Sequence, residues 1–391
     1  MSKYNYDKAA LKGLGVGPFL GEVKLREAKI AEAPAEDIKS IFNANIVAKT
    51  LHPHTQNLKV VKVEEDNDAK TFTFVGNEEK GTEKVAFFRA GQYLSVVIGM
   101  DGKFSTKPYT IASAPSFDEY KITVKKSPNG YASEYILNNW DVGTEVMTSG
   151  PLGNFYYQEL RDAKHIVAAA GGSGITPFLS MAGAVVAGLE DFDLTILYGS
   201  KTEDSILCKK ELDKLVAESN GKVNVVYVLS DEEKDGYEKG FVTADLIKKY
   251  GTGDYSLYVC GPKAMYDFLK EEVKKLDLPR RRIRFEVPGE SKVGTPGEEY
   301  NLTVWARGEK YELKCKSDET LLHACEEAGI GVTTDCRSGI CGWCRSRLIS
   351  GEIKITEDAD GRRAADKKFG WIHPCATFPL SDIEMEVFPV I

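Results

Sequence analysis

The sequence lacks an excess of positive charge and a secretory leader. Its 51 Lys and Arg are outnumbered by 59 Asp and Glu, which leaves a formal charge of −8 at pH 7. Nucleic-acid binding depends on a basic face that releases counterions, so we expect no nucleic-acid partner. The first residues, MSKYNYDKAALKGLG, contain no apolar core of a signal peptide. We therefore expect a cytoplasmic protein.

A continuous membrane helix is also missing. One stretch without Asp, Glu, Lys or Arg, from His165 to Leu189, has enough residues to cross a bilayer. However, GGSG interrupts its first third and breaks any continuous helix. A buried strand, a glycine turn and a buried helix fit this pattern better, so no membrane span is expected.

The 391 residues predict two or three domains, and the hydrophobic pattern changes along them. Short alternating runs such as KTFTFV and YKITVK are typical of an antiparallel barrel or sandwich. Later runs such as HIVAAA and YSLYVCG, with helical segments between them, are typical of a buried parallel sheet. The fold class is therefore multidomain, α+β and α/β. We expect an N-terminal extension, an antiparallel barrel, a parallel-sheet domain, a linker and a C-terminal domain at residues 1–41, 42–160, 161–286, 287–298 and 299–391.

Four of the eight cysteines have the spacing of a metal centre. DCRSGICGWC and the later HPC place them at Cys336, Cys341, Cys344 and Cys375. The x4 and x2 spacings are those of plant-type ferredoxins that hold a 2Fe–2S cluster. Gly339 and Gly342 allow the backbone to approach such a cluster closely. Structural zinc, which usually shows two CxxC pairs, is the rival interpretation. His373 is expected to be a loop or core histidine rather than a ligand.

The C-terminal segment resembles the β-grasp ferredoxins. By this resemblance, the segment SDETLLHACEEAGI would form the helix that crosses the sheet, and this helix would begin near Ser317 or Asp318. Cys315 and Cys325 lie outside the ligand motif and are expected to be buried apolar thiols. Trp343 either covers the cluster or contacts an electron acceptor.

Two motifs predict a nicotinamide cofactor. GGSGITP follows an apolar strand and begins a helix, where glycines and backbone N–H groups can receive a pyrophosphate. About ninety residues later, YVCGPKAM ends a second strand, which would place Cys260 against the nicotinamide. The residues after LTILYG would meet the adenosine ribose; their acidic neighbours favour NADH, while Lys201 leaves NADPH open. The predicted cofactor residues are Gly171, Gly172, Ser173, Gly174, Thr176, Ser200, Lys201, Cys260, Gly261 and Pro262.

STKPYTIASAP and VKKSPNGYASEYI complete a recognisable order of motifs. From residue 42 onward the chain resembles the ferredoxin–NADP reductase superfamily, and within it the oxygenase reductases that carry a C-terminal plant-type ferredoxin. The resemblance implies a flavin on the barrel, with Tyr109 packed on its ring and Thr110 bonded near its N5. The flavin is FAD or FMN, and the GYAS turn favours FAD. Lys107 stands where relatives have Arg and cannot form the same bidentate contact. The further implied flavin residues are Gly130, Tyr131, Ala132, Ser133 and Phe285.

These parts predict an electron-transfer enzyme. A nicotinamide donates two electrons as hydride, a 2Fe–2S cluster accepts one, and a flavin connects the two processes. We expect electrons to pass from NADH through flavin and cluster to a redox protein, such as an oxygenase component or a cytochrome, with Thr110 and Cys260 at the reacting centre. A self-sufficient reductase of a quinone or ferric chelate and a redox-sensing regulatory module are the alternatives. The run from Pro279 to Arg282 predicts a solvated turn rather than a phosphate clamp.

Overall fold

The computed structural model describes residues 17–32, 43–100, 103–127, 131–286, 297–355 and 359–388. The chain forms two compact units, residues 1–48 and residues 49–391. The described part of the first unit includes helix α2 (Gly17–Glu32). Helix α3 (Asn43–Leu51) precedes the first strand of the second unit, to which all the following elements belong. Among the described residues, no helix combines the length and apolarity that a membrane crossing requires.

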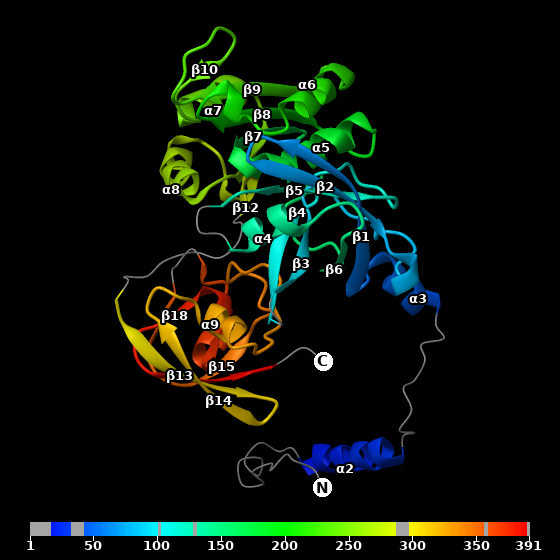
Figure 1. Ribbon diagram of the computed structural model, residues 1–391, viewed down its shortest axis with the longest axis vertical. Coiled ribbons are helices and arrows are strands. Elements are labelled where there is room, and N and C mark those ends of the chain that lie inside the picture. The colour runs from blue at the N-terminus through cyan, green and yellow to red at the C-terminus, as the bar shows by residue number, and fades with distance from the viewer. Residues whose placement is uncertain are drawn as a thin grey trace. The chain divides into compact units, whose positions relative to one another are not determined.

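The first body of the second unit is an antiparallel six-stranded sheet (Figure 1). Its strand order is β4-β3-β6-β1-β2-β5, and β4 also contacts β5, so that the sheet closes into the predicted barrel. Trp140 packs edge-on against Phe72 and Phe74 in its core. The elements are β1 (Thr55–Asp66), β2 (Ala69–Gly76), β3 (Tyr93–Met100), β4 (Lys103–Thr110), β5 (Tyr120–Lys125), α4 (Tyr131–Asn139) and β6 (Glu145–Ser149).

The second body is a six-stranded parallel sheet with the order β10-β9-β8-β7-β11-β12. The chain starts at β7, moves outward to one side, and then returns to place β11 on the other side of β7. Ligand crevices of parallel sheets form at such a reversal, outside the carboxyl ends of the strands. The elements are β7 (His165–Gly171), α5 (Thr176–Val186), β8 (Asp193–Ser200), α6 (Lys209–Glu218), β9 (Val223–Leu229), β10 (Glu238–Lys239), α7 (Ala244–Tyr250), β11 (Tyr255–Cys260), α8 (Lys263–Glu272) and β12 (Ile283–Glu286).

The third body has the mixed sheet β14-β13-β19-β15-β17 and a short pair of β16 and β18. Strand β13 pairs antiparallel with β14 and parallel with β19, as in a β-grasp fold. The elements are β13 (Glu299–Ala306), β14 (Glu309–Lys316), α9 (Leu321–Glu327), β15 (Ser346–Ser350), β16 (Ile353–Ile355), α10 (Ala364–Lys368), β17 (Trp371–Ile372), β18 (Thr377–Pro379) and β19 (Ile383–Val387). The predicted multidomain α+β and α/β fold class is confirmed.

The start of α9 differs from the prediction. Thr320, rather than Ser317 or Asp318, caps the helix, and its Oγ1 accepts the His323 backbone N–H at 3.2 Å. Ser317 still takes part in the strand pairing, because its backbone N–H donates to the Glu298 carbonyl oxygen. The helix cap therefore comes four residues after the end of β14. Cys315 and Cys325 are buried in the core of this body, as predicted.

The barrel and the parallel sheet share a dry interface. Phe155, which follows β6, packs its ring 5.9 Å from Phe178 on α5 and 5.0 Å from Tyr258 on β11. Ser180 Oγ on α5 donates to the Ser113 carbonyl oxygen of the barrel at 2.7 Å, and both side chains are buried. This interface holds the end of the barrel against the carboxyl ends of the parallel strands.

Candidate redox site

The four predicted cluster ligands lie together in the loop after α9 and at Cys375. Cys336 Sγ accepts the backbone N–H groups of Ser338 and Cys341, each at 3.4 Å. A hydrogen bond from the Cys341 thiol and these N–H donors lower the pKa of Cys336 to about 4. Cys344 Sγ lies 3.3 Å from Cys375 Sγ, well beyond the ~2 Å of a disulfide bond. Thiols arranged around inward-facing N–H donors fit an anionic 2Fe–2S cluster.

The backbone of this loop depends on its glycines and on His373. Gly339 has φ +77°, and a Cβ there would lie 2.0 Å from the Ala359 carbonyl oxygen. His373 is 3% exposed, and its Nδ1 donates to the Gly339 carbonyl oxygen at 2.6 Å. His373 is therefore a core residue that supports the loop, as predicted, and it does not replace a cysteine as a cluster ligand.

The same loop rests on the barrel strands that carry the predicted flavin motif. Thr334, two residues before Cys336, accepts through its carbonyl oxygen from Ser95 Oγ at 3.4 Å and Thr106 Oγ1 at 3.2 Å. Ser105 Oγ donates to Glu326 Oε2 at 3.2 Å. Ser95, Ser105 and Thr334 are buried, so water is excluded from the contact. Trp343 is 46% exposed and packs edge-on against His54, which leaves both of its predicted roles open.

A buried ion pair stiffens this contact. Both terminal nitrogens of Arg337, which follows the first ligand, bond to the Glu326 carboxylate at 2.6 and 2.8 Å. The Arg337 side chain is fully buried. Because Glu326 also contacts Ser105, the pair links the ligand loop, α9 and the barrel.

We expect Arg337→Met to lower the free energy of unfolding by about 3–5 kcal/mol, since it leaves the Glu326 carboxylate buried without its partner. Urea titration followed through the visible absorbance of the protein measures this. Arg347→Met, at an exposed position of β15, is the control and should change the value by less than about 0.5 kcal/mol. Equal losses of stability in both variants would contradict the conclusion that the Arg337–Glu326 ion pair stabilises this contact.

The predicted flavin residues lie at the end of β4. Lys107, Tyr109 and Thr110 are half-buried, and Tyr109 packs against the barrel core. Thr110 pairs with Tyr93 across β3 and β4. Burial first, and then the negative charges of Cys336 and Cys341, raise the pKa of Tyr93, which places that ring between the flavin strand and the ligand loop. A half-exposed tyrosine and a threonine on this strand suit an isoalloxazine ring.

The second flavin motif lies at the start of α4. Gly130 is outside the described residues, and Tyr131 begins the helix. Ala132 and Ser133 are buried, and Ser133 Oγ accepts the Ser127 backbone N–H at 3.2 Å. A helix N-terminus at this point fits the phosphate groups of a flavin nucleotide.

The two predicted nicotinamide turns touch each other. Strand register pairs Cys260 with Ala170, so the turn after β7 and the Cys260-Gly261-Pro262 turn leave the sheet side by side. A Cβ on Gly174 would lie 2.3 Å from the Cys260 carbonyl oxygen, so this backbone approach requires glycine. A Cβ on Gly172, with φ +52°, would meet open space. Thr176 begins α5, and its hydroxyl donates to the Ser173 carbonyl oxygen at 3.0 Å.

We expect Gly174→Ala to weaken NAD⁺ binding by about tenfold or more and to lower the thermal midpoint, because the methyl group meets rigid backbone at Cys260 and Gly261. Calorimetric titration with NAD⁺ and a thermal scan measure the two effects. Gly188→Ala is the control: Gly188 also has positive φ, +68°, but its Cβ would meet open space. It should cost about 1–2 kcal/mol of stability without changing NAD⁺ affinity.

The sequence reasoning missed a carboxylate beside Cys260. Register pairs Glu286, at the end of β12, with Cys260. Glu286 is half-buried by area, but desolvation of its carboxyl group raises its pKa to about 8, so it holds a proton at neutral pH. Phe285, predicted against the flavin, packs its ring 5.9 Å from Tyr266. Glu286 could have been found only from the register of the parallel strands β11 and β12, which places their last residues side by side.

Ser200 and Lys201 lie where β8 ends, at the same edge of the sheet. Their carbonyl oxygens accept the N–H groups of Ser230 and Asp231 at 3.0 and 2.9 Å. The nearby Glu203 carboxylate bonds to Lys234 and Tyr237, and its backbone N–H donates to Glu232. The acidic character of this loop suits a free ribose hydroxyl.

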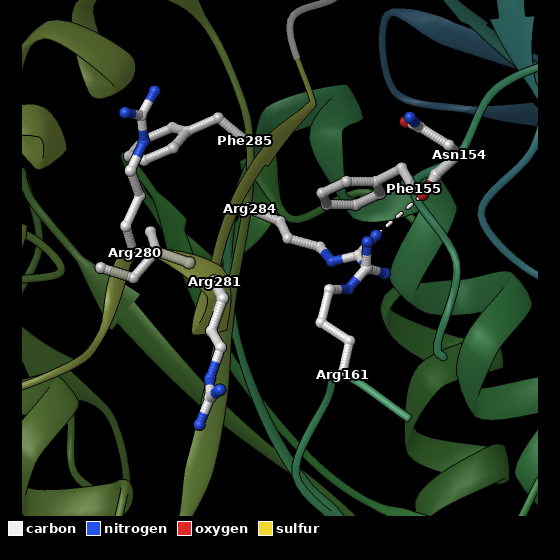
Figure 2. Close-up of a pocket in the computed structure, with 8 residues that line it drawn as sticks. Asn154, Phe155, Arg161, Arg280, Arg281, Arg284 and Phe285 are labelled. Carbon is white, nitrogen blue, oxygen red and sulfur yellow. Dashed lines mark hydrogen bonds between the residues drawn. The ribbon is translucent and has the colours of Figure 1, made fainter. Parts of the chain in front are cut away.

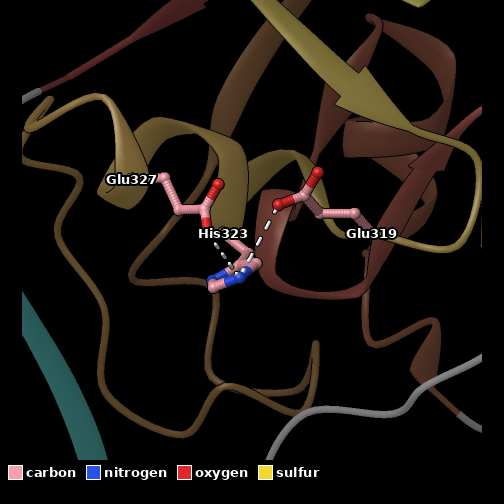
Figure 3. Close-up of side chains that lie close together, drawn as sticks. All are labelled: Glu319, His323 and Glu327. Atoms are coloured by element: carbon pink, nitrogen blue, oxygen red, sulfur yellow. Dashed lines mark ion pairs between the residues drawn. The ribbon is translucent and has the colours of Figure 1, made fainter. Parts of the chain in front are cut away.

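A second group of potential metal ligands is a surface ion-pair network (Figure 3). His323 Nε2 lies 3.6 Å from Glu319 Oε1 and 3.4 Å from Glu327 Oε1. Both carboxylates approach the same ring nitrogen. Burial also raises the pKa of Glu319, which makes it a poorer cation ligand. These residues form a local network at the start and along one side of α9.

Family models match the three bodies in the order found in the structure. The oxidoreductase FAD-binding domain matches residues 58–157, and the oxidoreductase NAD-binding domain matches residues 169–271. The 2Fe-2S iron-sulfur cluster binding domain matches residues 306–380.

Individual proteins are similar to all or part of this chain. The glycine betaine monooxygenase reductase subunit of Chromohalobacter salexigens is 24% identical, over 89% of this chain and 99% of the relative. NADH-cytochrome b5 reductase 1 of Candida glabrata is 34% identical, over 49% of this chain and 70% of the relative. The solved structure of phthalate dioxygenase reductase has a TM-score of 0.65 at 22% identity and covers 85% of this chain and 98% of its own length.

Proposed function

The chain belongs to the ferredoxin–NADP reductase superfamily, as a member with a C-terminal 2Fe–2S domain, and from this premise we propose that it passes electrons from NADH to an oxygenase-type protein partner. The contact of Thr334 with Ser95 and Thr106 is the observation that carries the proposal. It places the cysteine loop against the two strands at whose ends the flavin motif lies. The glycine betaine monooxygenase reductase subunit is similar to this chain over nearly its full length, which supports a partner of the oxygenase type.

Each cofactor has residues that would hold it. Cys336, Cys341, Cys344 and Cys375 would bind the cluster, and Lys107, Tyr109, Thr110 and the start of α4 would bind FAD. Gly171 to Gly174, Thr176 and the Cys260 turn would bind NADH, with Ser200 and Lys201 at its ribose. When bound, the flavin supplies the conversion of a two-electron hydride donor into single electrons, and the cluster carries one electron at a time.

The protein contributes position and a dry environment. Gly174 brings the two nicotinamide turns into contact, and the buried Cys260 thiol stays neutral because desolvation raises its pKa well above the usual value. Glu286 holds a proton beside this thiol. The buried hydroxyls of Ser95 and Ser105 exclude water where the ligand loop meets the barrel. These groups orient donor and acceptor, the main contribution that a protein makes to such transfers.

The finer organisation follows the same proposal. We divide the chain into a flavin-binding barrel at 42–160, a nicotinamide-binding domain at 161–286, a linker at 287–298 and a ferredoxin domain at 299–391, after an extension at 1–41. The linker and part of the extension lie largely outside the described residues. A cytoplasmic location completes the proposal.

Anaerobic titration with NADH tests the route. We expect loss of the flavin absorbance near 450 nm and the appearance of the EPR signal of a reduced 2Fe–2S cluster. If dithionite produces that signal and NADH never does, the route is wrong. Rapid turnover of a quinone without any protein partner would favour the self-sufficient reductase instead.

A further inference from the structure

An open pocket of about 510 Å³ lies between the end of the barrel and the last strand of the parallel sheet (Figure 2). Its volume falls in the range of small-molecule sites. Four guanidinium groups and two aromatic rings dominate its lining: Arg161, Arg280, Arg281, Arg284, Phe155 and Phe285. Arg280 and Arg281 lie in an exposed turn, as predicted, and they also form one wall of this pocket.

The guanidinium of Arg284 is fixed in place and nearly buried. Its side chain is 9% exposed, and its two terminal nitrogens donate to the Asn154 carbonyl oxygen at 2.8 Å and to Asp162 Oδ2 at 3.3 Å. The plane also stacks 5.1 Å from the Tyr258 ring. Its Nε is buried and has no hydrogen-bond partner in the described part of the chain. A buried donor left open in this way costs stability unless a ligand completes it.

The pocket has an excess of positive charge. Asp162 is the carboxylate shared by Arg284 and Arg161, and its side chain is fully buried. Arg280 and Arg281 form no ion pair with any described residue. Four guanidinium groups therefore line the pocket, and one carboxylate, that of Asp162, pairs with two of them, in a chain whose formal charge is −8. Such a local excess attracts anions.

The arrangement of the charges selects the kind of anion. Figure 2 shows the guanidinium groups of Arg161 and Arg284 side by side near the Phe155 ring, with Arg280 beside the Phe285 ring on the opposite wall. Guanidinium groups pair with phosphate through two parallel hydrogen bonds. Charges on two walls suit a ligand with more than one phosphate, and the aromatic rings can receive the flat face of a base.

We propose that this pocket binds a small diphosphate, either free pyrophosphate or the diphosphate of a nucleotide. The wall of the pocket formed by Arg280 and Arg281 is separate from the nicotinamide site, because these two residues precede β12 and lie toward the amino ends of the strands. The Cys260 turn lies at their carboxyl ends. The pocket is also separate from the predicted flavin phosphates at α4.

Calorimetric titration of the oxidised holoenzyme, saturated with FAD and NAD⁺, tests the proposal. Pyrophosphate and ADP are the probes, and we expect one molecule to bind per chain. Tighter binding of ADP would assign the pocket to a nucleotide, and tighter binding of pyrophosphate would assign it to the free anion. The absence of saturable binding of either probe up to about 1 mM would overturn the proposal.

Arg280→Gln together with Arg281→Gln should weaken probe binding about tenfold or more. Both side chains are exposed, so the fold is expected to survive. The control is Lys248→Gln with Lys274→Gln, two exposed positions of the same sheet domain with the same change of charge. The affinity of this control variant for the probes should stay within about twofold of the wild-type value. An equal weakening in the control pair, or displacement of the probe by NAD⁺, would refute a separate pocket.

Discussion

Cys344→Ala is expected to remove the iron from this protein and with it nearly all electron delivery to a protein acceptor. Cys344 is 3% exposed, and its Sγ lies 3.3 Å from Cys375 Sγ inside the ligand loop. Alanine cannot ligate iron, and no spare thiol replaces it: Cys315 and Cys325 are buried in the separate core of the β-grasp sheet. Bound iron should fall from about two per chain to near zero.

Two acceptors separate the cluster from the flavin in this experiment. Reduction of cytochrome c, a one-electron protein acceptor, should fall about 100-fold, because the last carrier is missing. Reduction of ferricyanide, which can take electrons from the flavin directly, should stay within about threefold. Iron analysis and EPR provide readouts that do not depend on turnover.

Cys325→Ala is the matched control, since it removes a fully buried thiol from the same body. It should lower stability by about 1–2 kcal/mol while leaving iron content and cytochrome c reduction intact. If Cys344→Ala keeps its iron, the four-thiol assignment is wrong. Zinc in the purified wild-type protein would have the same consequence.

Local motifs were predictable from the sequence because their chemistry lies within a few residues. The spacing from Cys336 to Cys344 and the glycine turn after β7 are examples, and the three-body fold followed from changes in hydrophobic period. What joins the bodies was not predictable. The Thr106 and Thr334 contact spans 228 positions, and the pairing of Glu286 with Cys260 depends on strand register.

The wrong prediction for the start of α9 and the unpredicted pocket at Arg280 and Arg281 have related causes, because both depend on contacts outside the local sequence. Ser317 and Asp318 are good cap residues by type, but the pairing of β14 continues to Lys316, so the helix begins only after Thr320. Arg280 and Arg281 belong to a short, charged stretch that would be solvated in isolation. Their role depends on Asn154 and Phe155, which the fold brings from more than a hundred residues away.

Cys260→Ala should have the second large effect, on the first step of the proposed route. Cys260 is 3% exposed, ends β11 and lies directly against the Gly174 turn. Its thiol lies at the turn that is expected to receive the nicotinamide, so its loss should leave the donor less well positioned. We expect the rate of flavin reduction by NADH to fall about 10–100-fold, with iron and flavin content unchanged.

The pH dependence of that step distinguishes a positioning thiol from a reacting thiolate. Burial raises the pKa of Cys260, so the group remains protonated as pH rises through the range where an ordinary thiol ionises. The wild-type rate of flavin bleaching in anaerobic stopped flow should therefore show no Cys260-dependent inflection between about pH 7 and 9. Cys208→Ala, at the half-buried start of α6, should leave the rate within about twofold. Glu286, whose pKa is about 8, lies beside Cys260, so Glu286→Gln is measured in parallel. An inflection near pH 8 that disappears in Cys260→Ala but persists in Glu286→Gln would mean that the thiolate takes part in the chemistry.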